Sequence, residues 1–377
     1  MKFIISRPDL ASLVGSIQGV VPSKPVTPIL SNVLIEAHNG KVILSTTDLK
    51  VSIRAQTQAN IIEEGAITLS ARRFFQLIRE LTIPEITLTT SDTNTAYIQA
   101  GESRFCFHGI HANTFPIFPT LTHTEHFSIS AKKLKEMLVK SAFAAAREDS
   151  RHVLNGVLMK IENHNAIFIG ADGKRLAKLL TSIELNSDHT HDYLISLKAV
   201  EEIIQLIDQE ESIEVYLDLD KIGIEGENTF LVTKLLSGKY PDVEHIIPKT
   251  SKFTLTLHRE ELITLLKQMA LFTTNKNQPI HFTFTPGELT LTAASIEIGE
   301  GKASMAVDYS GELLEISFNP LSFYDILRHS YDEIISLSIT DSYSPGLITD
   351  STSALYVIMP MRKLNYQSPA VTANHTS

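Results

Sequence analysis

The sequence predicts an α+β fold made of three copies of one doubled unit, and three observations support this prediction. The chain opens three times with a short alternating strand that runs into a helix, at Phe3, Phe127 and Phe253. These openings lie 124 and 126 residues apart, and a fixed period is typical of homologous repeats. The strands alternate between apolar and polar residues, which favours antiparallel sheets with one exposed face. Each repeat has room for only two helices of about ten to twelve residues.

The first strand-to-helix junction of each repeat predicts a helix with one apolar face. In the second repeat, Leu134, Met137 and Leu138 fall at helical spacing within residues 131–140. Leu262 has apolar partners at the same spacing in the third repeat. These helices directly follow the opening strands, so each repeat begins with a strand and a helix.

A second junction of the same kind recurs near the middle of each repeat, at Ser70, Ser196 and Asn319. The offsets are 126 and 123 residues, close to those of the openings. The helices predicted from these junctions are 71–80, 198–208 and 321–332. Each repeat therefore splits into two halves, and each half consists of a strand, a helix and several further strands.

The boundaries between repeats follow Pro-containing stretches. A recurring segment, 30–34 and again 154–158, lies 124 residues apart and supports the same alignment. The predicted domains are 1–122, 126–249 and 252–364. Residues 365–377 lack apolar periodicity, and we predict that they form a flexible tail.

Length and composition favour a globular cytoplasmic protein. The chain has 377 residues, of which 43% are hydrophobic and 20% charged, so it can bury a sizeable core. No run approaches the roughly 18 to 20 apolar residues of a membrane span, and the N-terminal apolar stretch is too short for a secretory signal. Cys106 is the single cysteine, which excludes an internal disulfide and favours a cytoplasmic location.

The net charge is −10, from 33 Lys and Arg against 43 Asp and Glu. As a sum, this charge argues against a nucleic-acid partner. Binding depends, however, on where the basic residues lie, and the sum leaves that question open.

Motifs of catalysis are missing from the sequence. It has no Walker A loop, Gly-x-Ser-x-Gly, His-Glu-x-x-His or Cys-x-x-Cys. The segment 189–191 (His-Thr-His) could bind a metal but lies in a polar stretch, and Cys106 between two phenylalanines favours a structural or surface thiol over a nucleophile. We therefore predict a binding protein without catalytic residues, metal or cofactor. Because carboxylates are numerous, an unrecognised hydrolase site stays an alternative.

Two segments are candidate binding sites. In the segment 170–177, Asp172-Gly173 predicts a tight turn between strands, and an ordinary hairpin is the alternative. The segment 356–364 ends in two methionines, a proline and an arginine. Methionine side chains adapt to varied apolar partners, which suits a surface that receives several ligands. The alternative is a final core strand, and Val357 and Met359 could serve both roles.

At these residues the chain resembles a known family, the bacterial DNA sliding clamps, which are the beta subunits of DNA polymerase III. The resemblance covers residues 1–364. The most specific pieces are 28–32 (Pro-Ile-Leu-Ser-Asn), 171–177 (Ala-Asp-Gly-Lys-Arg-Leu-Ala), 239–242 (Lys-Tyr-Pro-Asp), 318–320 (Phe-Asn-Pro) and 359–362 (Met-Pro-Met-Arg).

The resemblance implies a head-to-tail homodimer, a ring of six clamp domains around double-stranded DNA. Such a ring is a non-catalytic processivity factor in DNA replication, and it needs a separate clamp-loader complex to open it. It tethers the replicative polymerase alpha subunit, other polymerases and repair proteins through short peptides. Repeated modules joined heterologously do close into rings when the rotation per module is right. A monomeric scaffold that gathers peptides with the same folds is the alternative.

The resemblance also implies a peptide-binding groove between the second and third domains. Its residues would be Leu154, Gly173, Lys174, Arg175, Leu176, Pro241, Ile246, Val357, Met359, Pro360, Met361 and Arg362. The apolar members would hold leucine and phenylalanine of the partner, and Arg175 and Arg362 would hold its carbonyl or carboxylate groups. The chain departs from the family pattern at Ala171, Lys174 and His245, which concerns the selectivity for partners.

A basic lining of the ring would face DNA, and edge residues would join the subunits. The DNA-facing residues would be Lys24, Arg72, Arg73, Lys132, Lys133, Lys135 and Lys140. The dimer interface would join Phe105 and Phe107 of one chain to Leu271 and Phe272 of the other. An exposed helix face is the alternative for any single lysine, and a place in the domain core is the alternative for Phe105.

Overall fold

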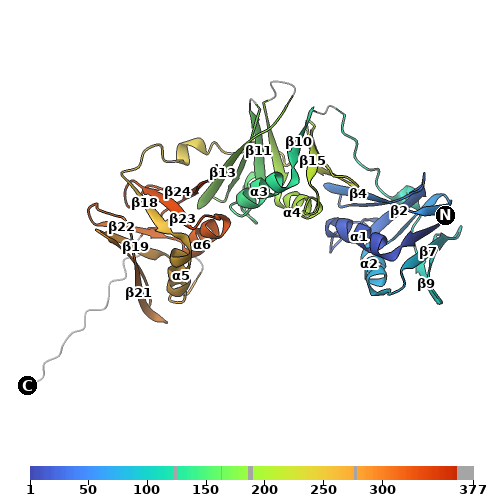
Figure 1. Ribbon diagram of the computed structural model, residues 1–377, viewed down its shortest axis with the longest axis horizontal. Helices are drawn as coiled ribbons and strands as arrows, with labels where there is room; N and C mark the ends of the chain where they lie inside the picture. The colour runs from blue at the N-terminus through green and yellow to red at the C-terminus, as the bar shows by residue number, and fades with distance from the viewer. Residues whose placement is uncertain (123–124, 163, 186–189, 276–277, 363–377) are drawn as a thin grey trace, which may run out of the picture. The chain divides into compact units, whose positions relative to one another are not determined.

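The computed structural model describes residues 1–122, 125–162, 164–185, 190–275 and 278–362 (Figure 1). The chain forms two compact units. The first comprises residues 1–169 and 180–240, and the second comprises residues 170–179 and the chain from 241 onward. The predicted tail, 365–377, lies outside the described residues. The three domain boundaries stay a prediction.

The first repeat follows the predicted order twice: a strand, a helix and several further strands. Its elements are β1 (Lys2–Ser6), α1 (Arg7–Ile17), β2 (Asn32–His38), β3 (Lys41–Thr47), β4 (Val51–Gln58), β5 (Asn60–Glu63), β6 (Gly65–Ser70), α2 (Ala71–Glu80), β7 (Glu85–Thr90), β8 (Thr95–Ala100) and β9 (Ser103–His108).

The second repeat has the same order. Its elements are β10 (Glu125–Ser130), α3 (Ala131–Ala142), β11 (Gly156–Glu162), β12 (Asn165–Ala171), β13 (Arg175–Ser182), β14 (His191–Ser196), α4 (Leu197–Leu206), β15 (Ser212–Leu217), β16 (Lys221–Glu225) and β17 (Thr229–Lys234).

The third repeat lies in the second unit. Its elements are β18 (Phe253–His258), α5 (Arg259–Ala270), β19 (Ile280–Thr285), β20 (Glu288–Ser295), β21 (Gly299–Ala306), β22 (Leu314–Phe318), α6 (Pro320–His329), β23 (Ile334–Ile339), β24 (Gly346–Thr349) and β25 (Leu355–Ile358).

Neighbouring strands pair in the antiparallel direction, as the alternation predicts. In the first unit the strand orders are β5-β1-β7-β8-β9, β10-β15-β16-β17-β4-β3-β2-β6 and β14-β11-β12. The second of these sheets joins two repeats, because β17 pairs with β4 and places Val232 opposite Ser52. In the second unit the orders are β13-β25-β24-β23-β18 and β21-β20-β19-β22.

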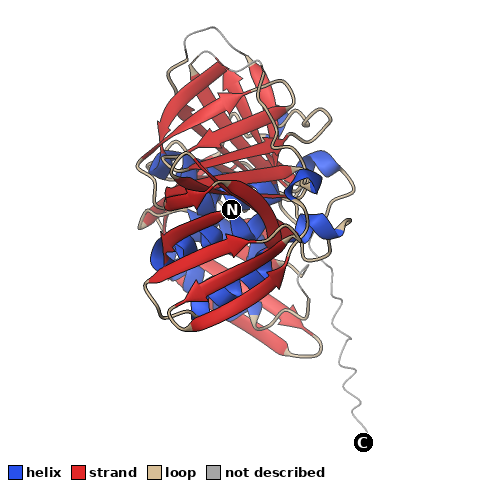
Figure 2. Ribbon diagram, turned by 90° about the vertical axis from the view of Figure 1, so that its right-hand side faces the viewer, coloured by secondary structure: helices blue, strands red, loops and turns tan. Residues whose placement is uncertain are grey.

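The helices pack in pairs, α1 with α2, α3 with α4 and α5 with α6, and sheets joined by loops surround them (Figure 2). The junction residues explain where the helices begin. Ser196 caps α4 by accepting a hydrogen bond from the Ala199 N–H, and Asn319 caps α6 in the same way, as N-cap residues do. The opening phenylalanines Phe3 and Phe127 are buried in the core.

The helix predictions are confirmed, with differences at the C-terminal ends. The predicted helix 71–80 is α2, and α3 extends the predicted 131–140 by two residues. The helix predicted at 321–332 ends at His329 because Ser330 turns to an extended backbone while its N–H still bonds to Ile326 O. None of the helices among the described residues is long and apolar enough to cross a membrane.

Candidate functional site

The turn between β12 and β13 has the predicted tight geometry. Oδ1 of Asp172 accepts hydrogen bonds from the Lys174 N–H at 2.8 Å and the Arg175 N–H at 2.9 Å. Gly173 adopts φ +82°, a left-handed conformation that glycine reaches without strain. Lys174 points from this turn as an exposed side chain.

The guanidinium of Arg175 ties this turn to α6. Its Nε lies 3.2 Å from Oδ2 of Asp172, and Nη1 lies 2.6 Å from Oδ2 of Asp325. The side chain is only 13% exposed. Arg175 is thus paired with two carboxylates of the same chain, and it stabilises the turn. Of the two arginines predicted to meet a partner, Arg362 is the exposed one.

The methionine segment after β25 runs beside the turn. The Met359 N–H donates to Lys174 O at 2.8 Å, and the Met361 N–H donates to Ser317 O at 2.7 Å. The Met359 side chain is 36% exposed, and Met361 is half-buried. Two backbone hydrogen bonds therefore fix the segment while its sulfur-containing side chains remain accessible.

The other predicted groove residues differ in burial. Leu176 and Val357 pair across β13 and β25, and both are buried, so they form the base of the sheet. Pro241 is exposed and Ile246 is half-buried. Leu154 is buried and belongs to the first unit. The structure thus brings together the turn and methionine members of the set.

Asp325 is a functional candidate that the sequence reasoning missed. It lies 150 residues from Arg175 in the chain, and no local motif marks the pair. One turn later on α6, the Nδ1 of His329 lies 2.7 Å from Asp325 O. Burial lowers the pKa of His329 below 6.5, although the Asp325 carbonyl and carboxylate act in the opposite direction.

The lysines of α3 differ in accessibility. Lys132 is exposed. Lys133 and Lys135 are each 40% exposed and pair with Glu136 and Asp208. All three side chains are thus at least partly exposed, and their contact with DNA stays a prediction.

Lys140 requires a correction. Its side chain is 0% exposed, and its Nζ lies 3.1 Å from Oε1 of Glu136. Position 140 falls on the apolar face of α3, one turn after Met137, and both residues are buried. Burial opposes ionisation of Glu136, yet the hydrogen bond and charge of Lys140 prevail and lower its pKa. Lys140 is therefore an internal ion-pair partner in this structure, and the prediction that it faces DNA is wrong for this conformation.

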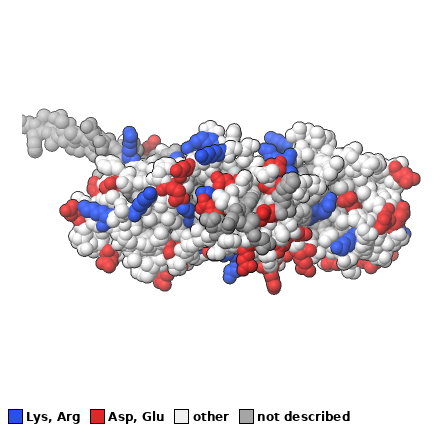
Figure 3. All heavy atoms as spheres, turned by 90° about the horizontal axis from the view of Figure 1, so that it is seen from above, with Lys and Arg blue, Asp and Glu red and all other residues white. Residues whose placement is uncertain are grey.

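The remaining basic candidates, Lys24, Arg72 and Arg73, are exposed. A further basic residue, Arg7 at the start of α1, donates from Nε to Ile78 O at 3.1 Å and caps the end of α2. On the face drawn in Figure 3, basic and acidic side chains are interspersed, in keeping with the overall charge of −10.

The predicted interface residues lie on or beside edge strands. Phe105 and Phe107 are half-buried on β9, the last strand of its sheet, so Phe105 is not part of the domain core. Leu271 is 72% exposed at the end of α5. Phe272 packs closely against β21. If Gly301 on this strand carried a Cβ, that atom would lie 2.5 Å from the Phe272 ring. Both β9 and β21 are edges, and an unpaired edge can pair with another chain.

Among the described residues, no group of three or more His, Cys, Asp or Glu could hold a metal ion. The residue His189 of the His-Thr-His segment lies outside the described residues. His191 lies on β14 with its ring centroid 4.9 Å from that of Tyr193.

The chain matches three domains of one family. The N-terminal, central and C-terminal domains of the DNA polymerase III beta subunit match residues 1–119, 128–242 and 244–362. A protein of Chlamydia pneumoniae named beta sliding clamp is 50% identical over 362 residues, which is 96% of this chain and 99% of that protein.

Solved structures agree over the same length. The DNA polymerase III subunit beta of Pseudomonas aeruginosa aligns with a TM-score of 0.93 and 28% identity over 96% of this chain and 100% of its own. A sliding clamp of Bartonella birtlesii bound to griselimycin aligns with a TM-score of 0.92 and 28% identity, over the same shares.

Proposed function

The chain belongs to the family of DNA polymerase III beta subunits, the beta sliding clamps, and from this premise we propose which of its residues serve DNA, ring closure and partners. It is a non-catalytic processivity factor of DNA replication. As a homodimeric ring it encircles duplex DNA and tethers the polymerase and other DNA-processing proteins. The proposals below concern individual residues and the location in the cytoplasm.

Encirclement explains how an acidic protein can stay on DNA. A closed ring leaves only by opening or by reaching a DNA end, so each direct contact with DNA can be weak. The exposed basic residues Lys24, Arg72, Arg73 and Lys132, with Lys133 and Lys135, meet phosphates without reading bases. Such contacts weaken steeply with salt and allow the ring to slide.

Ring closure joins β9 of one chain to β21 of the next. Both strands are sheet edges, and apolar side chains flank them. The exposed Leu271 and half-buried Phe272 on one side complement Phe105 and Phe107 on the other. Because the two edges differ, the contact is head-to-tail, and two chains close the ring.

Partner peptides bind at the turn and the methionine segment of the second unit. The observation that carries this proposal is the fixed, accessible segment beside Gly173 and Lys174, held by the Met359 and Met361 backbone bonds. Met359 and Met361 accept apolar side chains of the partner. Lys174 and Arg362 lie at the rim, where exposed charges select partners. The cytoplasm is the compartment in which such a chain would meet bacterial DNA.

The experiment that tests this function is retention on DNA after loading. Chains loaded by a clamp-loader complex onto nicked circular DNA should stay bound in a salt wash and be lost once the circle is cut. Equal loss from circular and linear DNA would favour the monomeric scaffold and contradict encirclement.

A further inference from the structure

A cavity of about 540 Å³ lies at the junction of the first and second repeats, wholly within the first unit. Its charged lining consists of Lys24, Lys50, Lys198, Lys234 and Asp48, and its apolar lining includes Leu30, Val51 and Leu235. We call it the lysine cavity. Its architecture repeats that of the first peptide site proposed above, which consists of the turn at Asp172-Gly173 with Met359 and Met361 and which we call the methionine groove. That groove lies one repeat later in the chain.

The first correspondence is the turn. Oδ1 of Asp48 accepts from the Lys50 N–H at 2.9 Å and the Val51 N–H at 2.7 Å. Asp172, 124 residues later, accepts from the two equivalent N–H groups of its own turn. The residue after each aspartate has a left-handed backbone, with φ +75° at Leu49 and φ +82° at Gly173.

The second correspondence is the strand end beside the turn. The Lys234 N–H donates to Lys50 O at 2.9 Å. The Met359 N–H donates to Lys174 O at 2.8 Å in the same way. Lys234 therefore stands where the groove has Met359.

The third correspondence lies two residues further on. The Leu236 N–H donates to Leu194 O at 2.8 Å, just as the Met361 N–H donates to Ser317 O at 2.7 Å. Leu194 and Ser317 both lie two residues before the cap of the following helix. Leu236 therefore occupies the position of Met361, and both side chains are half-buried.

We propose that the lysine cavity is a second peptide-binding site, which takes an acidic peptide with apolar anchor residues. The proposal rests on the assignment of the methionine groove as the first site. The same backbone frame holds a different set of side chains here, so the two sites differ in the peptides that they select.

Charge decides the class of peptide. Lys198 pairs with Asp48, whereas Lys50 and Lys234 are exposed at the cavity, which Lys24, assigned to DNA above, also lines. Four lysines against one aspartate leave a positive excess, and complementary charge selects an acidic partner. The exposed Val26 and the half-buried Leu235 and Leu236 supply contacts for anchor residues, which a phosphate backbone does not need.

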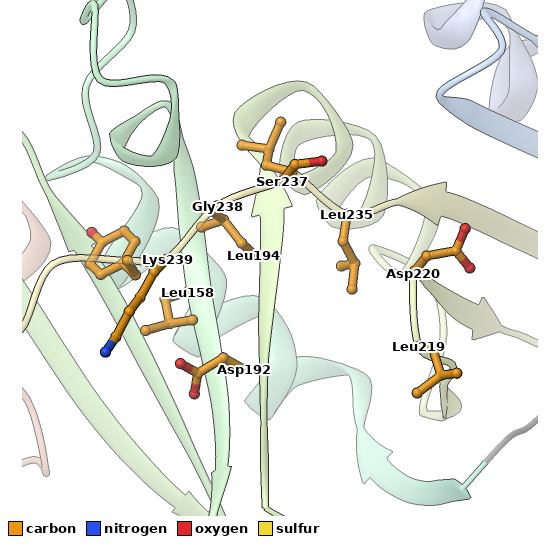
Figure 4. Close-up of a pocket in the computed structure, with 11 residues that line it drawn as sticks. Leu158, Asp192, Leu194, Leu219, Asp220, Leu235, Ser237, Gly238 and Lys239 are labelled. Carbon is orange, nitrogen blue, oxygen red and sulfur yellow. The ribbon is translucent and has the colours of Figure 1, made fainter.

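An adjoining cavity of about 220 Å³ extends the site (Figure 4). Leu235, Leu236 and Ser237 line both cavities. Leu158 and Asp192 lie on one side of the second cavity and Asp220 on the other (Figure 4). Its two aspartates outnumber its one lysine, Lys239, so it disfavours acidic side chains. The acidic residues of the peptide therefore lie over the lysines of the first cavity, and an apolar residue enters the second.

Calorimetry of the full-length dimer with two matched probes tests the proposal. The acidic probe is acetyl-Glu-Leu-Glu-Leu-Phe-amide, and the neutral probe replaces both glutamates with serine. We expect two acidic probes per chain but one neutral probe. The double variant Lys50→Glu/Lys234→Glu should lose one acidic probe per chain, with affinity at that site reduced at least about tenfold. A matched reversal outside both cavities, Lys249→Glu/Lys252→Glu, should keep two.

The variant Met359→Ala/Met361→Ala separates the two assignments. It should lose the neutral probe and keep one acidic probe, in the lysine cavity. If the Met359→Ala/Met361→Ala variant binds the neutral probe normally, the assignment of the methionine groove is overturned, whereas that of the lysine cavity is not. A single acidic probe per wild-type chain would overturn the lysine cavity. So would a Lys50→Glu/Lys234→Glu variant that binds a DNA duplex less tightly yet keeps both acidic probes, because the lysines would then serve DNA.

Discussion

A carboxylate oxygen of Asp325 on α6 lies 2.6 Å from the guanidinium of Arg175, across 150 residues of sequence. The pair closes a bridge from α6 to the β12–β13 turn, because the same guanidinium also contacts Asp172. Arg175 is only 13% exposed whereas Asp325 is 38% exposed, so the guanidinium side of the bridge is shielded from water. The turn that carries the exposed Lys174 is thereby fixed.

Removal of either partner of this bridge should loosen the turn. We expect Asp325→Ala and Arg175→Ala each to lower the free energy of unfolding by about 1 to 3 kcal/mol. The double variant should cost less than the sum, because the two residues share one interaction. Urea unfolding of the four proteins measures this coupling, and strictly additive losses would show that the bridge carries no energy.

Lys140 and Lys132 should have opposite effects. Lys140→Ala removes a buried stem and its pairing with Glu136, so the unfolding free energy should fall by about 1 to 3 kcal/mol while DNA affinity stays constant. Lys132→Ala should keep stability but reduce the slope of log affinity against log salt by about 0.9. Fluorescence titrations of duplex DNA at several salt concentrations distinguish the two, and a reduced slope in Lys140→Ala would restore Lys140 as a DNA contact.

Ring closure should depend on the apolar residues at the two edges. Phe107→Asp or Leu271→Asp buries a charge in the contact, and the dimer dissociation constant should rise at least about tenfold. Ile117→Asp is the control, since Ile117 is 94% exposed and lies on neither edge. Sedimentation gives the masses, and an intact dimer in both edge variants would place the interface elsewhere.

Acidification should destabilise the protein through His329. Because burial lowers the pKa of His329 in the fold below 6.5, the unfolded chain binds more protons as the pH falls through 6.5. The contribution of neutral His329 to stability is therefore present above pH 6.5. It is lost as the pH falls from 6.5 toward the lower pKa that His329 has in the folded protein. Glu202, whose pKa burial raises above 4.5, acts in the opposite direction at lower pH.

The variant His329→Asn isolates this effect. The unfolding free energy of the wild type minus that of the variant should be smaller at pH 5 than at pH 7.5. A difference that stays constant over this range would show that His329 keeps its ordinary pKa in the fold.

The helices and the tight turn could be predicted from the sequence because their signals are local and recur in each repeat. Ser70, Ser196 and Asn319 each lie at the start of a helix, and the side chains of Ser196 and Asn319 cap theirs. Local capping and apolar spacing therefore suffice to place these elements, and at Ser70 the spacing alone does so. The turn at Asp172-Gly173 is local in the same sense, and its hydrogen bonds agree with the prediction.

Contacts between distant segments could not be predicted in this way. The count of lysines on α3 ignores their direction, and only the packing of α3 shows that Lys140 lies on the buried face with Met137. The bridge from Arg175 to Asp325 depends on how β13 and α6 come together, which no residue near either partner signals. The roles of lysines and arginines are therefore the hardest to assign from a sequence, because a charged side chain can form an ion pair inside the fold.

Electron microscopy of the purified chain at low micromolar concentration, with its mass measured in parallel, tests the central claim most directly. A clamp should appear as closed rings with a central hole, at twice the chain mass of 41.8 kDa. Compact or C-shaped particles of a single chain mass would contradict encirclement by a dimer.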